Sequence, residues 1–258
     1  MQVNFKSGIK ALSLIICIIS FLAVSLYLFH PSDQRLPVQA ESTYLFHPGF
    51  GNPTIDGYVD PGEWAGADSH TIDIESVSIA GTLTATLYVM QNETDLFLGY
   101  VLNDDEFTTD YLYGIYGDTA FIEFDDNNSG ALYEVNENRV SIYASSPWYH
   151  DKYFFSDTGG AYDDITQVGG ETNGAGASGR HGDLTHYELR FPLCSGDTYD
   201  FCLSPGDVLG LRVGYYDIYM GTSELTAVIW YYPSVSTTSL VTIKLEDFLF
   251  SYLPLVVK

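Results

Sequence analysis

The sequence predicts an all-β domain, an antiparallel β-sandwich, preceded by an N-terminal signal or transmembrane helix. Three observations predict this fold class. Tyr, Phe and Trp make up 15% of the 258 residues, and these residue types suit the pleated, half-buried surface of a strand. Short apolar runs recur from about residue 49 onward, with turn residues between them. No long stretch repeats its apolar residues with the period of a helix.

The runs that predict strands follow one another along most of the chain. "TLTATLYVM" and "DLFLGYVLN" flank "QNET", a pattern typical of a hairpin. The other runs are "TIDIESVSIA", "DTAFIEFDD", "RVSIYAS", "THYELRFPL", "DVLGLRVGYYDI", "TAVIWYY" and "LVTIKLEDF". Many short strands with turns between them favour two packed antiparallel sheets. The hydrophobic content of 46% is enough for one sizeable core.

Residues 156–184 break this pattern, because they are rich in Gly and Asp and poor in large apolar residues. One interpretation is a long mobile loop. The other is a loop that faces a ligand, since loops of this length are uncommon unless they are functional or disordered.

The N-terminal residues contain the apolar run "ALSLIICIISFLAVSLYLF", preceded by two lysines. A run of this length can span a bilayer, and the lysines predict that the N-terminus stays in the cytoplasm. The run is either an uncleaved anchor or a signal peptide cleaved near "VQA". Both interpretations place the following domain outside the cytoplasm, secreted or at the cell surface, with membrane contact only through this helix.

We therefore expect four parts in the chain. They are an N-terminal signal or anchor helix at 1–29, a polar linker at 30–48, the β-sandwich at 49–250 and a short C-terminal tail at 251–258.

The formal net charge of −24 excludes some classes of partner. Such an acidic surface repels phosphate backbones, so nucleic acid is not expected as a partner. It also argues against docking on anionic lipid. The many carboxylates are instead free to bind cations.

Two cysteines remain outside the apolar run, Cys194 and Cys202 in "CSGDTYDFC". A turn-rich spacer between two cysteines in an exported protein favours a disulfide that closes a small loop. Zinc is the less favoured alternative, because there is neither a second cysteine pair nor a nearby histidine pair.

The stretch "TIDGYVDPGEW" places three acids and one large aromatic residue near the start of the domain. Asp60 can cap a helical turn, Pro61 suits the first helical position, and Glu63 completes a capping box. Trp64 would then pack into the core.

The sequence favours a non-catalytic protein. It contains neither a "GxSxG" nucleophile elbow nor an "HExxH" metal motif. A carboxylate pair for glycoside cleavage carries no information here, because acids are abundant throughout the chain.

Several blocks follow in an order that resembles a known family. They are "IDGYVDPGEW", "TATLYVMQNETDLFLGYVLNDDEF", "DTAFIEFDDNN", "HYELRFPL", "LGLRVGYYDI" and "VIWYYPSVSTTSLVTIKL". From about residue 49 to 246 the chain resembles family 9 carbohydrate-binding modules and the related DOMON-like sandwiches, through block order rather than any single motif. The resemblance implies an extracytoplasmic, non-catalytic module that binds polysaccharide and belongs with secreted polysaccharide-degrading enzymes.

The resemblance also implies structural calcium. Carried over position by position, Asp56, Asp60 and Glu63 match a calcium site that fixes the N-terminal turn, and Asp217 matches an acid at the end of a comparable strand. Calcium takes six to eight oxygens, so backbone carbonyls or water would supply the remainder. Capping and calcium binding are compatible uses of these acids, and both interpretations stay open.

Family members resembling this chain hold sugar between two aromatic rings. Trp230 matches the second of these walls. The first wall is not a Trp in this sequence, so Tyr113 or Tyr116 would take its place, and Trp148 is a further aromatic residue in a predicted turn. Core packing is the alternative role of Trp230.

Two other functions are consistent with the fold class. Some DOMON-like relatives bind haem through Met and His or Lys side chains and transfer electrons, which here would involve Met90 or Met220. Ordinary core packing is the alternative role of both methionines. The second function is a cell-surface structural or adhesion domain without a small ligand.

Overall fold

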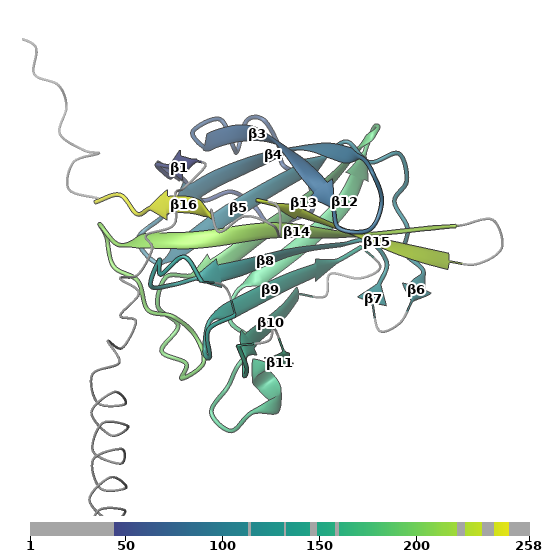
Figure 1. Ribbon diagram of the computed structural model, residues 1–258. Helices are drawn as coiled ribbons and strands as arrows, with labels where there is room; N and C mark the ends of the chain where they lie inside the picture. The colour runs from purple at the N-terminus through teal and green to yellow at the C-terminus, as the bar shows by residue number, and fades with distance from the viewer. Residues whose placement is uncertain are drawn as a thin grey trace, which may run out of the picture. The chain divides into compact units, whose positions relative to one another are not determined.

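The computed structural model describes residues 44–112, 115–131, 133–144, 149–157, 160–220, 225–233 and 240–247. This part of the chain is almost entirely β-structure with antiparallel pairing, as the sequence predicts (Figure 1). The predicted helix at 1–29, most of the linker and the tail lie outside the described residues, so these boundaries stay predictions. Among the described residues, no helix has both the length and the hydrophobicity to cross a membrane.

The strands have the following bounds. They are β1 (Leu45–Phe46), β2 (Gly49–Phe50), β3 (Asp68–Ser76), β4 (Thr82–Gln91), β5 (Asp95–Leu102), β6 (Tyr111–Leu112), β7 (Ile115–Tyr116), β8 (Thr119–Asp125), β9 (Asn138–Tyr143), β10 (Tyr149–Phe154), β11 (Ala161–Asp163), β12 (Ala175–His181), β13 (Leu184–Pro192), β14 (Val208–Met220), β15 (Leu225–Tyr232) and β16 (Val241–Lys244). One 3₁₀ turn, η1 (Asp164–Thr166), follows β11.

A continuous hydrogen-bonded path runs in the order β11-β10-β9-β8-β14-β15-β3-β4-β5-β13-β12. The pairing along this path is shortest between β15 and β3, which pair only at Trp230↔Ser76 and Tyr231↔Glu75. The main core contains buried side chains from both sides of this junction, including Leu87 and Leu98 on one side and Val213 on the other. The path therefore forms two layers packed on one core.

Every run that the sequence predicts as a strand contributes to one of these strands. The predicted β4–β5 hairpin is confirmed, with pairing from Ala85↔Leu102 to Gln91↔Leu96. The side chain of Asn92 closes its turn by accepting hydrogen bonds from the backbone N–H groups of Thr94 (2.8 Å) and Asp95 (2.7 Å).

The expectation of a loop throughout residues 156–184 is wrong, because residues 175–181 form β12, which pairs with β13 along its whole length. Its "AGASGRH" sequence has no apolar alternation, and two of its small residues fit close neighbours. A Cβ on Gly176 would lie 2.8 Å from Ile142 Cγ1, and one on Gly179 would lie 2.9 Å from the Gly57 carbonyl oxygen. Tertiary crowding, and not strand propensity, therefore accounts for this composition.

Candidate functional site

Asp60 caps the N-terminal turn as the sequence predicts. Asp60 Oδ1 accepts hydrogen bonds from the backbone N–H groups of Gly62 (2.7 Å) and Glu63 (3.3 Å). The N–H of Trp64 donates to the carbonyl of Asp60 at 2.9 Å, which closes a single helical turn. Glu63 does not complete the predicted capping box. Its carboxylate instead accepts hydrogen bonds from the N–H (2.8 Å) and the hydroxyl (3.0 Å) of Thr54.

Glu188 on β13 anchors this turn, and no local sequence pattern marks this residue. Its Oε2 accepts from the N–H groups of Asp56 (2.9 Å) and Gly57 (2.8 Å). Its Oε1 accepts from the indole N–H of Trp64 at 2.9 Å. The side chain is fully buried, and this burial raises its pKa while the hydrogen bonds oppose the rise. The turn is therefore held by an acid 124 residues distant in sequence from Trp64.

Trp64 packs into a small second core beneath the turn, as predicted. It is 2% exposed and belongs to a cluster with Val59, Met90 and Phe97. The same cluster accounts for Met90, one of the two methionines considered as a haem ligand. The side chain of Met220, the other, lies outside the described residues.

The four acids predicted to bind calcium do not converge. Asp56 Oδ1 accepts from the N–H of Tyr58 at 3.0 Å, while Asp217 lies on β14 and its Oδ2 accepts from the indole N–H of Trp230 at 3.3 Å. Among the described residues, Asp56, Asp60, Glu63 and Asp217 do not bring three oxygens within 4.8 Å of one another. Calcium binding by this set stays a prediction, and the role that the geometry gives these acids is hydrogen bonding.

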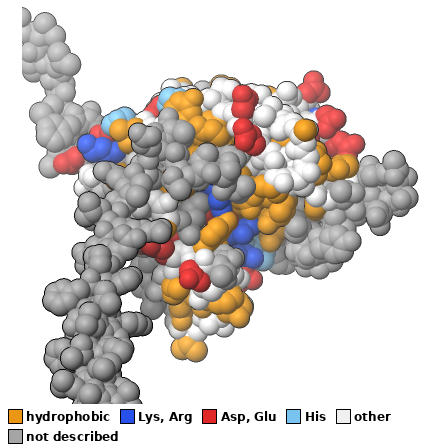
Figure 2. Space-filling view, viewed as in Figure 1, with side chains coloured by type: hydrophobic (Ala, Val, Ile, Leu, Met, Phe, Trp, Pro, Cys, Tyr) orange, Lys and Arg blue, Asp and Glu red, His pale blue; other side chains and the backbone are white. Residues whose placement is uncertain are grey.

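Acidic side chains are also spread over the surface. On the face shown in Figure 2 they lie at scattered positions and not in one patch. The large negative charge of the chain therefore does not by itself mark a cation site on this face.

Trp230 is part of the main core. It is 5% exposed, and a Cβ on Gly81 would lie only 3.5 Å from Cη2 of its ring. Its hydrogen-bond partner Asp217 is also in a poorly solvated position, where burial raises its pKa to about 6. Trp230 is therefore not an exposed stacking platform in this structure. Tyr113, Trp148 and the side chain of Tyr116, the other predicted sugar contacts, lie outside the described residues.

An open pocket of about 570 Å³ lies beside the N-terminal turn. Five segments of the chain form it: the turn, β4, β5, β12 and β13 with the β12–β13 connection. The lining residues are Tyr58, Val59, Pro61, Tyr88, Val101, Arg180, His181, Gly182, Leu184 and His186. The pocket combines aromatic rings with side chains that form hydrogen bonds.

Several polar groups of the pocket are fixed by neighbours. The rings of Tyr58 and His181 lie 4.2 Å apart, tilted by 30°. Arg180 Nη1 donates to the carbonyls of Asp104 (2.6 Å) and Glu106 (3.1 Å). Burial lowers the pKa of His186 to about 4, so this imidazole is neutral at pH 7. These contacts leave a preorganised surface with little conformational entropy to lose on binding.

The predicted disulfide is present, linking Cys194 to Cys202 across a sequence separation of 8. The two cysteines also form an isolated antiparallel bridge. The loop between them is thereby closed, and it contains Asp197 and Asp200.

No protein-family model matches the chain, and no curated protein matches its sequence. Similarity to solved structures is clear. A family 9 carbohydrate-binding module from Caldicellulosiruptor kristjanssonii in complex with cellotriose superposes with a TM-score of 0.56 at 16% identity, covering 81% of this chain and 97% of the module. The glucose complex of a family 9 module from that organism gives a TM-score of 0.54 at 16% identity, covering 79% and 96%.

A cytochrome domain of cellobiose dehydrogenase from Myriococcum thermophilum also matches, with a TM-score of 0.35, 17% identity and coverage of 70% and 88%. A likeness at that level carries no argument for haem. The class that the structure defines is a β-sandwich with the fold of family 9 carbohydrate-binding modules.

Proposed function

We propose that this domain is a non-catalytic carbohydrate-binding module that acts outside the cytoplasm and binds a glycan or polysaccharide. The observation that carries the proposal is the open pocket lined by Tyr58, Tyr88 and His181 on a sandwich with the fold of family 9 modules. The similar modules were solved with cellotriose and with glucose, which makes soluble glucans the first ligands to test.

The chemistry of the pocket suits a neutral sugar. The C–H face of a pyranose packs on aromatic rings, and its hydroxyls need side chains that donate and accept hydrogen bonds. Among the lining residues, Tyr58 and Tyr88 supply aromatic rings, and Arg180 and His181 supply polar side chains. The neutral state of His186 avoids burying a charge beneath an uncharged ligand.

The region around Trp230 is a second location at which carbohydrate binding can be tested. The two walls predicted from the resemblance are Trp230 and either Tyr113 or Tyr116, with Trp148 as a further aromatic residue. Ligand stacking on Trp230 would first require movement of what covers its ring. The pocket at the turn requires no such movement, and we favour it for that reason.

Affinity electrophoresis of the purified full-length chain against a panel of polysaccharides tests the proposal. We expect retardation by at least one glucan, and loss of that retardation in Tyr58→Ala and Tyr88→Ala with a melting temperature close to that of the wild type. The matched control is Tyr162→Ala, which removes a half-exposed Tyr on β11 and should migrate like the wild type.

Two outcomes would count against the proposal in different ways. Unchanged wild-type mobility across the panel would contradict carbohydrate binding itself. Retardation that persists in both pocket variants but is lost in Trp230→Phe would move the site to the Trp230 end of the sandwich. Trp230→Ala is less informative, because truncating a buried Trp costs about 3–5 kcal/mol of folding free energy.

A further inference from the structure

We propose that Asp151, Asp164 and Asp200 form a calcium site that ties β10 and η1 to the disulfide-closed loop. These acids are not among those that the sequence singled out. They lie outside the residues that line the turn pocket, so this proposal does not depend on carbohydrate binding.

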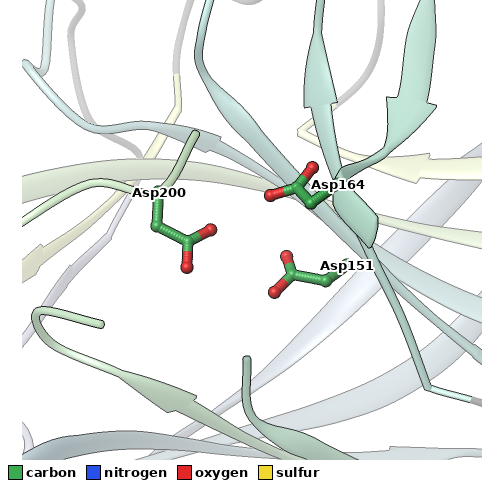
Figure 3. A group of neighbouring side chains, drawn as sticks. All are labelled: Asp151, Asp164 and Asp200. Carbon is green, nitrogen blue, oxygen red and sulfur yellow. The ribbon is translucent and has the colours of Figure 1, made fainter. Parts of the chain in front are cut away.

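Three separate segments bring the acids together. Asp151 lies in β10, Asp164 is the first residue of η1, and Asp200 belongs to the loop between Cys194 and Cys202. One carboxylate oxygen from each lies within 4.8 Å of the corresponding oxygens of the other two. Figure 3 shows the three carboxylates turned toward a common space.

The oxygens that face this space have no hydrogen-bond partner. Both oxygens of Asp164, Oδ1 of Asp151 and Oδ2 of Asp200 are buried and unpaired. Asp151 and Asp164 are 2% and 0% exposed, so water does not compensate them freely. Buried polar groups are nearly always paired in native proteins, and four such oxygens together point to a missing cation.

The remaining carboxylate oxygens are used to orient the cluster. Asp151 Oδ2 accepts from the N–H of Asn173 at 2.9 Å, and Asp200 Oδ1 accepts from Nδ2 of Asn138 at 2.9 Å. Asp151 and Asp200 are thus each held by one hydrogen bond while the second oxygen of each faces the cluster, and both oxygens of Asp164 are free. This division between an orienting oxygen and a free oxygen is the arrangement expected of metal ligands with outer-shell support.

The electrostatics of the cluster also require a positive charge. Among the ion pairs of the described residues, none involves these three acids, and the nearby Lys152 pairs with Asp163 at 3.3 Å. A bound divalent cation would compensate the buried negative charge that no side chain compensates.

Calcium fits this ligand set better than other common ions. Carboxylate oxygens suit hard cations, whereas zinc prefers Cys and His. Calcium accepts six to eight oxygen ligands in a flexible geometry, so carboxylates from three separate segments can share one ion with other oxygens. Magnesium requires bonds of about 2.0–2.1 Å and a tighter octahedron. The hydroxyl of Tyr149 is also buried and unpaired. Burial raises its pKa, and the charges of all three acids raise it as well.

A small pocket shares one residue, Asn173, with the surroundings of the cluster. It has a volume of about 170 Å³ and is lined by Gly169, Glu171, Asn173, Ser195, Gly196 and Asp197. Asn173 is the residue that orients Asp151. Asp197 itself is already engaged, since Oδ1 accepts from the N–H of Tyr199 and Oδ2 from that of Glu171.

The test is calcium binding and thermal melting of the full-length chain after chelation. We expect that calcium at roughly 100 times its dissociation constant raises the melting temperature of the wild type by roughly 5–10 °C. Asp151→Asn and Asp164→Asn should each lose this shift and bind one calcium ion fewer per chain in equilibrium dialysis. Without calcium, both variants should melt close to the chelated wild type, because an Asn at position 151 can still accept the hydrogen bond from Asn173 and the Asp164 carboxylate makes none.

The control is Asp183→Asn, which changes an exposed acid in the β12–β13 connection and should keep the calcium shift. The proposal is overturned if the wild type binds no calcium, or if both cluster variants keep the wild-type stoichiometry and shift. It is also overturned if both variants fail to fold in chelator while the chelated wild type folds, since the carboxylates would then be needed without a cation.

Discussion

Two groups of acids in this domain look alike in composition and differ in their surroundings. At the N-terminal turn, Asp60 accepts from Gly62 and Glu63 accepts from Thr54, and Glu188 beneath it accepts from four residues of that segment. In the cluster of Asp151, Asp164 and Asp200, four oxygens have no partner. The difference shows that the number of acids does not identify a cation site.

The two regions compensate negative charge in different ways. A carboxylate that accepts several N–H bonds is stabilised in its ionised form by those dipoles. In the cluster, the first cause of the raised pKa of Asp151 is burial, and the second is the charge of Asp200. The carboxylates of the turn are therefore compensated by hydrogen bonds, whereas four oxygens of the cluster have no such compensation.

The largest expected effect comes from replacing Glu188, the β13 residue whose carboxylate holds the N-terminal turn. Glu188→Gln keeps the size of the side chain but places an amide N–H₂ group against N–H donors that now point at a carboxylate oxygen. Unpaired buried donors cost about 1–3 kcal/mol each, so we expect a loss of about 3 kcal/mol or more in the free energy of unfolding, measured with urea. Glu75→Gln, at an exposed position of β3, is the control. A loss below about 1 kcal/mol for Glu188→Gln would show that these bonds do not hold the turn.

The second effect comes from opening the loop that carries Asp200. Removing the disulfide with Cys194→Ala and Cys202→Ala should cost about 2–3 kcal/mol, since a cross-link across a short loop restricts the unfolded chain. It should also weaken calcium binding, because Asp200 would no longer be held beside Asp151. Urea unfolding and equilibrium dialysis measure the two effects, and a reducing agent should not destabilise the double variant further. Two free thiols in the wild-type protein, purified without a reducing agent, would contradict the prediction.

Local patterns in the sequence predicted the strands with clear apolar runs, the capping role of Asp60 and the disulfide. These features depend on residues close together in the chain. The burial of Glu188 was not predictable in this way, because "HYELRFPL" alternates so that Tyr187 and Leu189 face the main core, and the other face of such a strand is ordinarily polar. Only the position of the turn above β13 buries it.

The acid cluster was beyond sequence reasoning for the same physical reason. Its members come from three segments that only the tertiary fold brings together. β10 itself is missed because His150, Asp151 and Lys152 interrupt its apolar pattern. An aromatic residue in a strand likewise packs in the core or faces a ligand, and the sequence of "VIWYY" left the role of Trp230 open.

The smallest expected effect separates capping from calcium binding in the turn. Asp60→Ala removes the acceptor for the N–H groups of Gly62 and Glu63 and should cost about 1 kcal/mol, the usual cost of losing such a cap. If capping is its whole role, this cost is the same with calcium and with chelator, and the calcium-dependent melting shift stays at its wild-type size. A cost that appears only when calcium is present would show that Asp60 binds the ion. Asp60→Asn refines the comparison, because an amide oxygen still accepts the two hydrogen bonds while the charge is lost. It should recover most of the stability if hydrogen bonding alone holds this turn.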